Sequence, residues 1–176
     1  MIMGRRPGWW PGGWSRCPTY EAADVVGAMA VLRELEEPHT VLIDLEPGVV
    51  PWESPLDRVQ PAVSSLEEML DGLPVRHIGF LVSNTRRCLG GTAFGFPLLT
   101  RARKPWTSRH LVPEPGRDLP VVVVGDQWLT DGLLAFRWRG QFVRLTARAA
   151  DAPWWPRLQT WVGRLVAPVF FTDRQS

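Results

Sequence analysis

The sequence predicts an α/β fold, in which an open and mostly parallel β-sheet is covered by helices on both faces. Short apolar runs bounded by turn residues, such as the four valines of 121–124, are typical of strands that are buried on both faces. These runs alternate with stretches in which apolar residues recur at helical spacing, and this alternation favours a parallel sheet with crossover helices. A chain of 176 residues is long enough for one domain of this kind.

The first half of the chain predicts two helix–strand units after a short arm. Residues 1–18 are rich in Gly, Pro and Trp and lack periodicity, so we expect a loosely ordered arm. The elements expected after it are a helix from Thr19 to Pro38, a strand over 39–45, a turn over 46–48, a helix over 64–73 and a strand over 77–82. Ser65 and Glu68 form a capping-box pattern for the second helix, and Gly72 ends it.

The second half continues the same alternation with one interruption. We expect strands over 96–100, 121–124 and 141–145 and a short helix over 130–136. The tail from Trp154 to Phe171 is expected to form an amphipathic helix that starts at Pro156 and ends near Pro168. Pro113, Pro115 and Gly116 interrupt the segment before Val121, so the crossover helix there is expected to be missing or truncated. The predicted organisation is therefore an arm (1–18), a core domain (19–150) and a C-terminal helix and tail (151–176).

Composition and charge exclude several classes of function. The formal net charge of +2 is too small to favour nucleic-acid binding by the protein's electric field. No apolar run reaches the roughly 18 residues of a membrane-spanning helix, and the arginines near the N-terminus precede no apolar run of a secretory signal. Two cysteines, Cys17 and Cys88, cannot form a disulfide framework or a thiolate zinc site. A reducing, cytoplasmic location is expected.

Polar residues follow the predicted strands at the end where an open parallel sheet binds its ligands. These residues are Asp44, Glu46, Ser83, Asn84, Lys104, Asp126 and Asp131. Crowded carboxylates repel one another unless a cation neutralises them, and Mg²⁺ prefers oxygen ligands and acts beside phosphate groups. Lys104 is the only lysine among 20 basic residues, which favours a specific role for its ammonium group. The set therefore predicts a magnesium site that handles phosphate.

Four segments resemble, in order, the motifs of the haloacid dehalogenase (HAD) superfamily. The runs VLIDLEPGVVPW, FLVSNTRR, FPLLTRARKP and VVVVGDQWLTD are similar to those of the YqeG-type phosphatases, which include mitochondrial phosphatidylglycerophosphate phosphatases. The resemblance covers roughly residues 19–146. It implies a HAD-like Rossmannoid three-layer sandwich. Only 38 residues separate Asp44 from Ser83 and 20 separate Ser83 from Lys104, which leaves no room for a cap domain.

The resemblance also implies roles for the individual residues. Asp44 would be the nucleophile and a Mg²⁺ ligand, and Glu46 the general acid/base with its backbone carbonyl on the metal. Ser83, Asn84 and Lys104 would bind the phosphoryl group, although a turn-forming role for Asn84 is an equal alternative. Asp126 and Asp131 would complete the metal site. The implied substrate is a phosphomonoester, and an uncapped site would suit a bulky one such as a phospholipid phosphate.

The first motif departs from the family pattern Asp-x-Asp-x-Thr, because this chain has Glu46, Pro47 and Gly48 there. The extra methylene of Glu46 moves its carboxyl group by about an ångström, and misplacement on that scale can lower a rate by roughly 10²-fold. Pro47 also removes an N–H group from the loop. A second function therefore stays open, namely a catalytically impaired HAD-like protein that binds metal, phosphate or a protein partner.

The C-terminal helix carries an apolar stripe at helical spacing, formed by Leu158, Trp161, Val162, Leu165 and Val166. We expect the face with Leu158, Trp161 and Leu165 to pack onto the sheet, because such stripes usually face a core. The alternative is a peripheral contact with a membrane through the Trp-rich ends of the chain, which include Trp9, Trp10 and Trp14.

Overall fold

The computed structural model describes residues 16–84, 97–99, 102–147 and 154–173, and it confirms the α/β fold. Every strand pairing in this part of the chain is parallel, and the strands form one seven-stranded sheet of order β4-β3-β2-β5-β6-β1-β7. The strands are β1 (Cys17–Ala22), β2 (Thr40–Asp44), β3 (Ile78–Val82), β4 (Leu98–Leu99), β5 (Val121–Gly125), β6 (Gln141–Leu145) and β7 (Phe171–Asp173). The arrangement is Rossmann-like.

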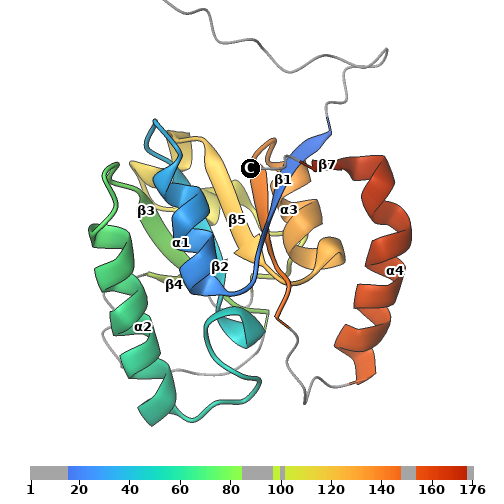
Figure 1. Ribbon diagram of the computed structural model, residues 1–176, viewed down its shortest axis with the longest axis horizontal. Helices are drawn as coiled ribbons and strands as arrows, with labels where there is room; N and C mark the ends of the chain where they lie inside the picture. Colours follow the sequence, from blue (N-terminus) through green and yellow to red (C-terminus); the bar gives the residue numbers. More distant parts are fainter. Residues whose placement is uncertain (1–15, 85–96, 100–101, 148–153, 174–176) are drawn as a thin grey trace, which may run out of the picture.

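Helices cover both faces of the sheet, which gives three layers (Figure 1). They are α1 (Val25–Arg33), α2 (Leu56–Asp71), α3 (Leu133–Arg137) and α4 (Trp154–Phe170). Single turns are formed by η1 (Leu45–Val49), η2 (Arg109–Leu111), η3 (Gly116–Asp118) and η4 (Trp128–Gly132). None of the described helices is long and apolar enough to cross a bilayer.

Alternation along the central strands builds two separate cores. Val41 and Ile43 of β2 pack with α1 and α2 on one face, whereas Leu42 packs on the other face with α3 and Phe171. All five residues of β2 and all five of β5 are buried. This burial explains why both strands are continuous apolar runs, since a parallel sheet between two helical layers exposes neither face.

The N-terminal arm and the first predicted helix are corrected at residues 17–22. Cys17 and Pro18 do not belong to an arm, and Thr19 does not begin a helix, because these residues form β1 between β6 and β7. Helix α1 begins only at Val25, where the Asp24 carboxylate accepts a hydrogen bond from the Gly27 N–H. Residues 1–15 of the predicted arm lie outside the described residues.

Helix α2 begins eight residues before the predicted start at 64, so the expected capping box of Ser65 and Glu68 is wrong. Both residues lie inside the helix, whereas the stop at Gly72 is confirmed. Pro61 lies inside the helix, although proline lacks the N–H that a helix interior uses. Its side chain lies on the exposed side of α2, away from the buried residues of that helix.

The remaining elements agree closely with expectation, with two differences at the C-terminus. The segment between Lys104 and Val121 contains only the turns η2 and η3, as its prolines indicated. Helix α4 begins at Trp154 and passes Pro168, and the short strand β7 follows it. The face of α4 with Leu158, Trp161 and Leu165 is exposed, so its predicted packing on the sheet is wrong.

Candidate functional site

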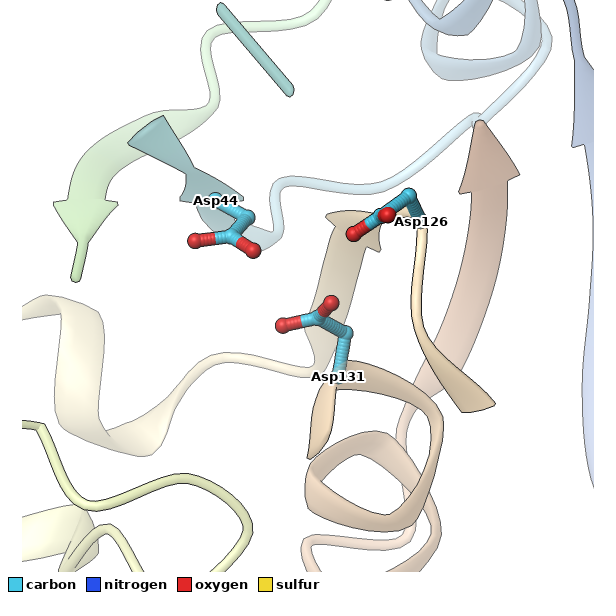
Figure 2. A group of neighbouring side chains, drawn as sticks. All are labelled: Asp44, Asp126 and Asp131. Carbon is cyan, nitrogen blue, oxygen red and sulfur yellow. The ribbon is translucent and has the colours of Figure 1, made fainter. Parts of the chain in front are cut away.

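Three aspartates meet at the carboxyl ends of two neighbouring strands. Asp44 is the last residue of β2, Asp126 directly follows β5, and Asp131 lies in η4 just beyond it. Because β2 and β5 pair in parallel, their ends lie side by side. One carboxylate oxygen of each aspartate lies within 4.8 Å of those of the other two. Figure 2 shows the three carboxyl groups turned toward a shared space.

Lys104 joins this cluster from a separate segment of the chain. Its Nζ lies 2.6 Å from Asp44 Oδ1 and 2.6 Å from Asp131 Oδ1, and all three side chains are buried. The lysine backbone is held by Asn84, whose Oδ1 accepts a hydrogen bond from the Lys104 N–H at 2.7 Å. The Asn84 amide group also donates to the Lys104 carbonyl at 3.5 Å. Asn84 therefore positions the lysine segment.

Asp131 is fixed from several directions. Its Oδ2 accepts a hydrogen bond from the Gln127 N–H at 3.2 Å, and its own N–H donates to the Gln127 carbonyl at 3.0 Å. Gly125 lies against the same carboxyl group, and a Cβ atom there would be 2.4 Å from Asp131 Cγ. Only glycine leaves enough space for this approach of backbone to carboxylate.

Burial and mutual repulsion raise the pKa of two of the carboxyl groups. The pKa of Asp44 is well above its usual range because of burial first and the charge of Asp131 second, although Lys104 opposes both. Burial and Asp131 likewise raise the pKa of Asp126 to about 7. Burial alone would lower the pKa of Lys104, but Asp131 and Asp44 outweigh it and raise that pKa above its usual value. The ammonium group therefore stays charged.

The donor set fits a divalent cation. When all three carboxyl groups are ionised, they and the ammonium group have a net charge of −2, which a divalent cation would balance. Asp126 Oδ1 is buried without a hydrogen-bond partner, so one oxygen of the cluster lacks the donor that burial normally demands. Opposite oxygens around an octahedral Mg²⁺ ion lie about 4 Å apart, which is comparable with the spread of these atoms. The cluster of Asp44, Asp126 and Asp131 could therefore bind a metal ion.

The other predicted site residues lie near the same edge with different partners. Ser83 is buried directly after Val82, which is the register partner of Asp44 in β3. Glu46 is buried in η1, where its Oε1 accepts a hydrogen bond from the Glu53 N–H at 3.1 Å. Its carboxylate is not part of the three-aspartate cluster found among the described residues. Phosphate binding by Ser83 and Asn84 and metal binding through Glu46 stay predictions.

Arg144 is a residue of the site that the sequence did not reveal. Its positive charge, carried on β6, lowers the pKa of Asp126 and so opposes the larger effects of burial and Asp131. The guanidinium group pairs with Glu21 of β1 and lies 5.2 Å from the ring centre of Trp128. Most basic residues of the chain are arginines, so no sequence signal singled this one out.

Taken together, the site combines a buried carboxylate at a strand end, two further carboxylates and one ammonium group. Such a set can hold a divalent cation and an anionic phosphoryl group beside a potential nucleophile. Compared with protein-family models, curated proteins and solved structures, the chain matches none of them.

Proposed function

We propose that the chain is a Mg²⁺-dependent phosphatase of the HAD type that acts through an aspartyl-phosphate on Asp44. The proposal depends on one observation, the meeting of Asp44, Asp126 and Asp131 with Lys104 at the carboxyl edge of the sheet. A purely structural role would not require a third carboxylate, that of the partly buried Asp126, beside a buried ammonium group that already pairs with Asp44 and Asp131, because like charges away from water are costly. Phosphoryl transfer uses such a set, since it needs mainly positioning and charge neutralisation.

In the proposed reaction, an oxygen of Asp44 attacks phosphorus, and the bond between phosphorus and the leaving oxygen breaks. The leaving oxygen takes a proton from Glu46. A water molecule, which returns a proton to Glu46, then attacks the phosphorus and releases inorganic phosphate and the free Asp44 carboxylate. Lys104 neutralises the anionic group throughout. Asp44, Asp126 and Asp131 would hold Mg²⁺, which when bound supplies positive charge beside the phosphoryl oxygens.

The proposed substrate class is a bulky phosphomonoester, and a phospholipid phosphate such as phosphatidylglycerophosphate is the first candidate. The argument for an uncapped site is that the chain has too few residues between its predicted site residues to form a cap domain. The 38 residues between Asp44 and Ser83 are used by η1, α2 and β3 together with their connections. An open site would admit a substrate whose phosphate projects from a large group.

The direct test is hydrolysis by the purified full chain with Mg²⁺, measured with p-nitrophenyl phosphate and with phosphatidylglycerophosphate. Asp44→Asn should abolish turnover of both, because the amide cannot act as the nucleophile. Asp71→Asn, which changes an exposed carboxylate at the end of α2, is the matched control and should leave turnover unchanged. Turnover that survives Asp44→Asn would exclude the proposed mechanism.

A catalytically impaired relative that binds metal, phosphate or a protein partner is the second candidate. The observation that favours this candidate is the hydrogen bond from the Glu53 N–H to Glu46 Oε1. This bond holds the carboxylate of the proposed acid/base against the loop that follows η1. Glu46→Asp combined with Gly48→Thr restores the usual family pattern. A Cβ at Gly48 would meet only the flexible end of Leu145 at 3.3 Å and Asp44 Cβ at 3.7 Å, so the space permits this change. A large gain from almost no activity would identify an impaired site.

A further inference from the structure

Helix α4 turns its most apolar side away from the domain. The exposed fractions are 74% for Trp154, 61% for Trp161, 62% for Leu165 and 65% for Val169, and Leu158 is also exposed. These five residues recur at intervals of four, three, four and four, so they form one stripe along the helix. We call this stripe the outer face of α4. Single exposed apolar residues are common on proteins, but a continuous stripe with two tryptophans marks an interaction surface.

The opposite side of α4 holds the helix on the domain. Gly163 is buried, and a Cβ atom there would lie 2.8 Å from the Cβ atom of Trp128 in η4. Near the end of the helix, the ring of Phe170 packs edge-on against Phe136 of α3 at 5.1 Å. The absence of a side chain at Gly163 thus permits close contact with the domain, and this contact fixes which side of the helix faces outward. The exposure of the outer face is a consequence of specific packing.

The charges of α4 indicate what covers its outer face. Between Trp154 and Phe170 the helix carries two basic residues, Arg157 and Arg164, and no acidic residue. Both arginines are exposed and lie along one flank of the stripe. A second copy of the same helix would therefore bring only like charges together. An anionic surface would complement the arginines and bury the stripe at the same time.

The N-terminal residues of the chain are a poor cover for this face for the same reason. Residues 1–15 contain Arg5, Arg6 and three tryptophans but no acidic residue. Residues 1–15 and α4 thus both carry arginine and tryptophan without an acidic residue, so their charges repel each other and would be drawn to the same anionic partner.

We propose that the outer face of α4 binds the surface of an anionic phospholipid bilayer, with the helix lying in the plane of the interface. Tryptophan is enriched at this level of a membrane, because its ring is apolar and its N–H group is polar. The 17-residue helix would bury its apolar stripe at the boundary of headgroups and acyl chains, while Arg157 and Arg164 contact lipid phosphates. This proposal does not depend on the proposed phosphatase activity.

The topology gives such a contact a defined relation to the aspartate cluster. Helix α4 follows β6 and leads back to the start of β7, so its first turn lies at the carboxyl edge of the sheet (Figure 1). The aspartate cluster lies at the same edge. The helix also packs against η4, the turn that carries Asp131. Binding along the whole of α4 would therefore lay one side of the sheet against the bilayer, with the carboxyl edge at the first turn of the helix and the opposite edge at its last turn.

The test is co-sedimentation of the full chain with vesicles of phosphatidylglycerol and phosphatidylcholine, compared with vesicles of phosphatidylcholine alone. We expect the chain to bind the anionic vesicles. Trp161→Glu combined with Leu165→Glu should lower its partition coefficient by about tenfold or more, because both substitutions place charge in the apolar stripe. Val26→Glu, at an exposed apolar position on α1, is the matched control and should not change binding. All these positions are exposed, so the thermal midpoints should stay close to that of the parent chain.

A second pair of variants tests the electrostatic part. Arg157→Gln combined with Arg164→Gln should weaken binding to anionic vesicles by about tenfold and change binding to phosphatidylcholine little. The proposal is overturned if the parent chain does not sediment with anionic vesicles, or if the Trp161/Leu165 double variant binds as well as the parent. It is also overturned if the chain is a dimer in sedimentation equilibrium that the same double variant converts to monomers. That result would identify a second copy as the occupant.

Discussion

Gly125 and Asp131 approach each other so closely that a Cβ atom at residue 125 would lie 2.4 Å from Asp131 Cγ and 2.4 Å from Oδ2. The backbone at the end of β5 thus packs directly against the Asp131 carboxyl group, which also pairs with Lys104. Gly125→Ala should displace Asp131 and lower the free energy of unfolding by about 1–3 kcal/mol. If the proposed phosphatase activity is present, the same change should lower its turnover by roughly 10²-fold.

The matched control for this change is Gly72→Ala at the end of α2. The nearest atom to a Cβ there is the Glu68 carbonyl oxygen at 3.4 Å, so the extra methyl group fits. Urea unfolding and steady-state turnover of both variants would check the prediction. Equal behaviour of the two alanine variants would show that the position of Asp131 is not critical.

Asp126→Asn should have opposite effects on stability in the absence and presence of metal. Without metal, the change removes a buried charge beside Asp131, so the thermal midpoint should stay constant or rise. With Mg²⁺ at about 100 times its dissociation constant, the parent chain should gain about 2.7 kcal/mol, and the variant should gain much less. Differential scanning calorimetry with and without Mg²⁺ measures both effects, with Asp71→Asn as the control that responds like the parent. An equal gain by the Asp126 variant would remove this residue from the metal site.

Lys104→Met should destabilise the metal-free chain strongly at a pH of about 8, where the carboxyl groups tend to ionise. The change leaves Asp44 and Asp131 without the ammonium group that lies 2.6 Å from each, and breaking a buried pair typically costs about 3–5 kcal/mol. Arg103→Met, which removes the exposed neighbouring cation, should change the free energy of unfolding by less than about 0.5 kcal/mol. Urea titrations of the two variants compare them directly, and similar midpoints would contradict the role given to Lys104.

His77 should make the chain less stable in mild acid. Burial first and the charge of His39 second lower the pKa of His77 below its usual value of 6.5. Its Nδ1 accepts a hydrogen bond from the His39 N–H at 3.2 Å, which a proton on that nitrogen would break. The unfolded chain therefore binds more protons below pH 6.5 than the folded chain, and the free energy of unfolding falls as the pH is lowered through this range.

His77→Asn keeps an acceptor close to the position of Nδ1 but cannot bind the proton. The variant should lose less stability than the parent when the pH falls from about 7 to about 5.5. His110→Asn, at an exposed histidine of η2, should follow the parent curve. Thermal melts of the three proteins across this range provide the measurement, and parallel curves for parent and His77→Asn would refute the assignment.

The central strands were predictable because each is a buried apolar run with a turn after it. Strands β2, β3, β5 and β6 begin and end within one or two residues of their predicted limits. Strands β1 and β7 were missed because pairing, rather than local pattern, defines them. In β1, buried Cys17, Thr19 and Ala22 are separated by the less buried Tyr20 and Glu21, a sequence that also suits a helix.

The outward direction of α4 could not be predicted from periodicity. The spacing of Leu158, Trp161 and Leu165 shows that one face is apolar, but it does not show which side of the helix faces the domain. That choice depends on Gly163 meeting Trp128, a contact between residues far apart in the sequence. The tight approach of Gly163 was not recognisable before the position of Trp128 was known.

The sequence predicted which residues form the site better than it predicted the hydrogen bonds that these residues make. Asp44, Asp126 and Lys104 follow from the rule that ligands lie beyond the carboxyl ends of parallel strands. The bonds of Asn84 to the Lys104 backbone and of Glu46 to the Glu53 N–H depend on loop conformations that no short-range pattern specifies. Phosphate binding by Asn84 and metal binding through Glu46 stay predictions beside these contacts.

Because the described strands all run in the same direction, the two ends of the sheet carry different ionisable residues. The carboxylates and Lys104 gather where the strands end, whereas His39 and His77 stand just before β2 and β3 begin. A mild drop in pH therefore acts at both ends of the sheet, because it protonates Asp126, whose pKa is about 7, before it reaches the lowered pKa of His77. Acid would thus reduce the negative charge available to a cation at one end while it destabilises the fold from the other.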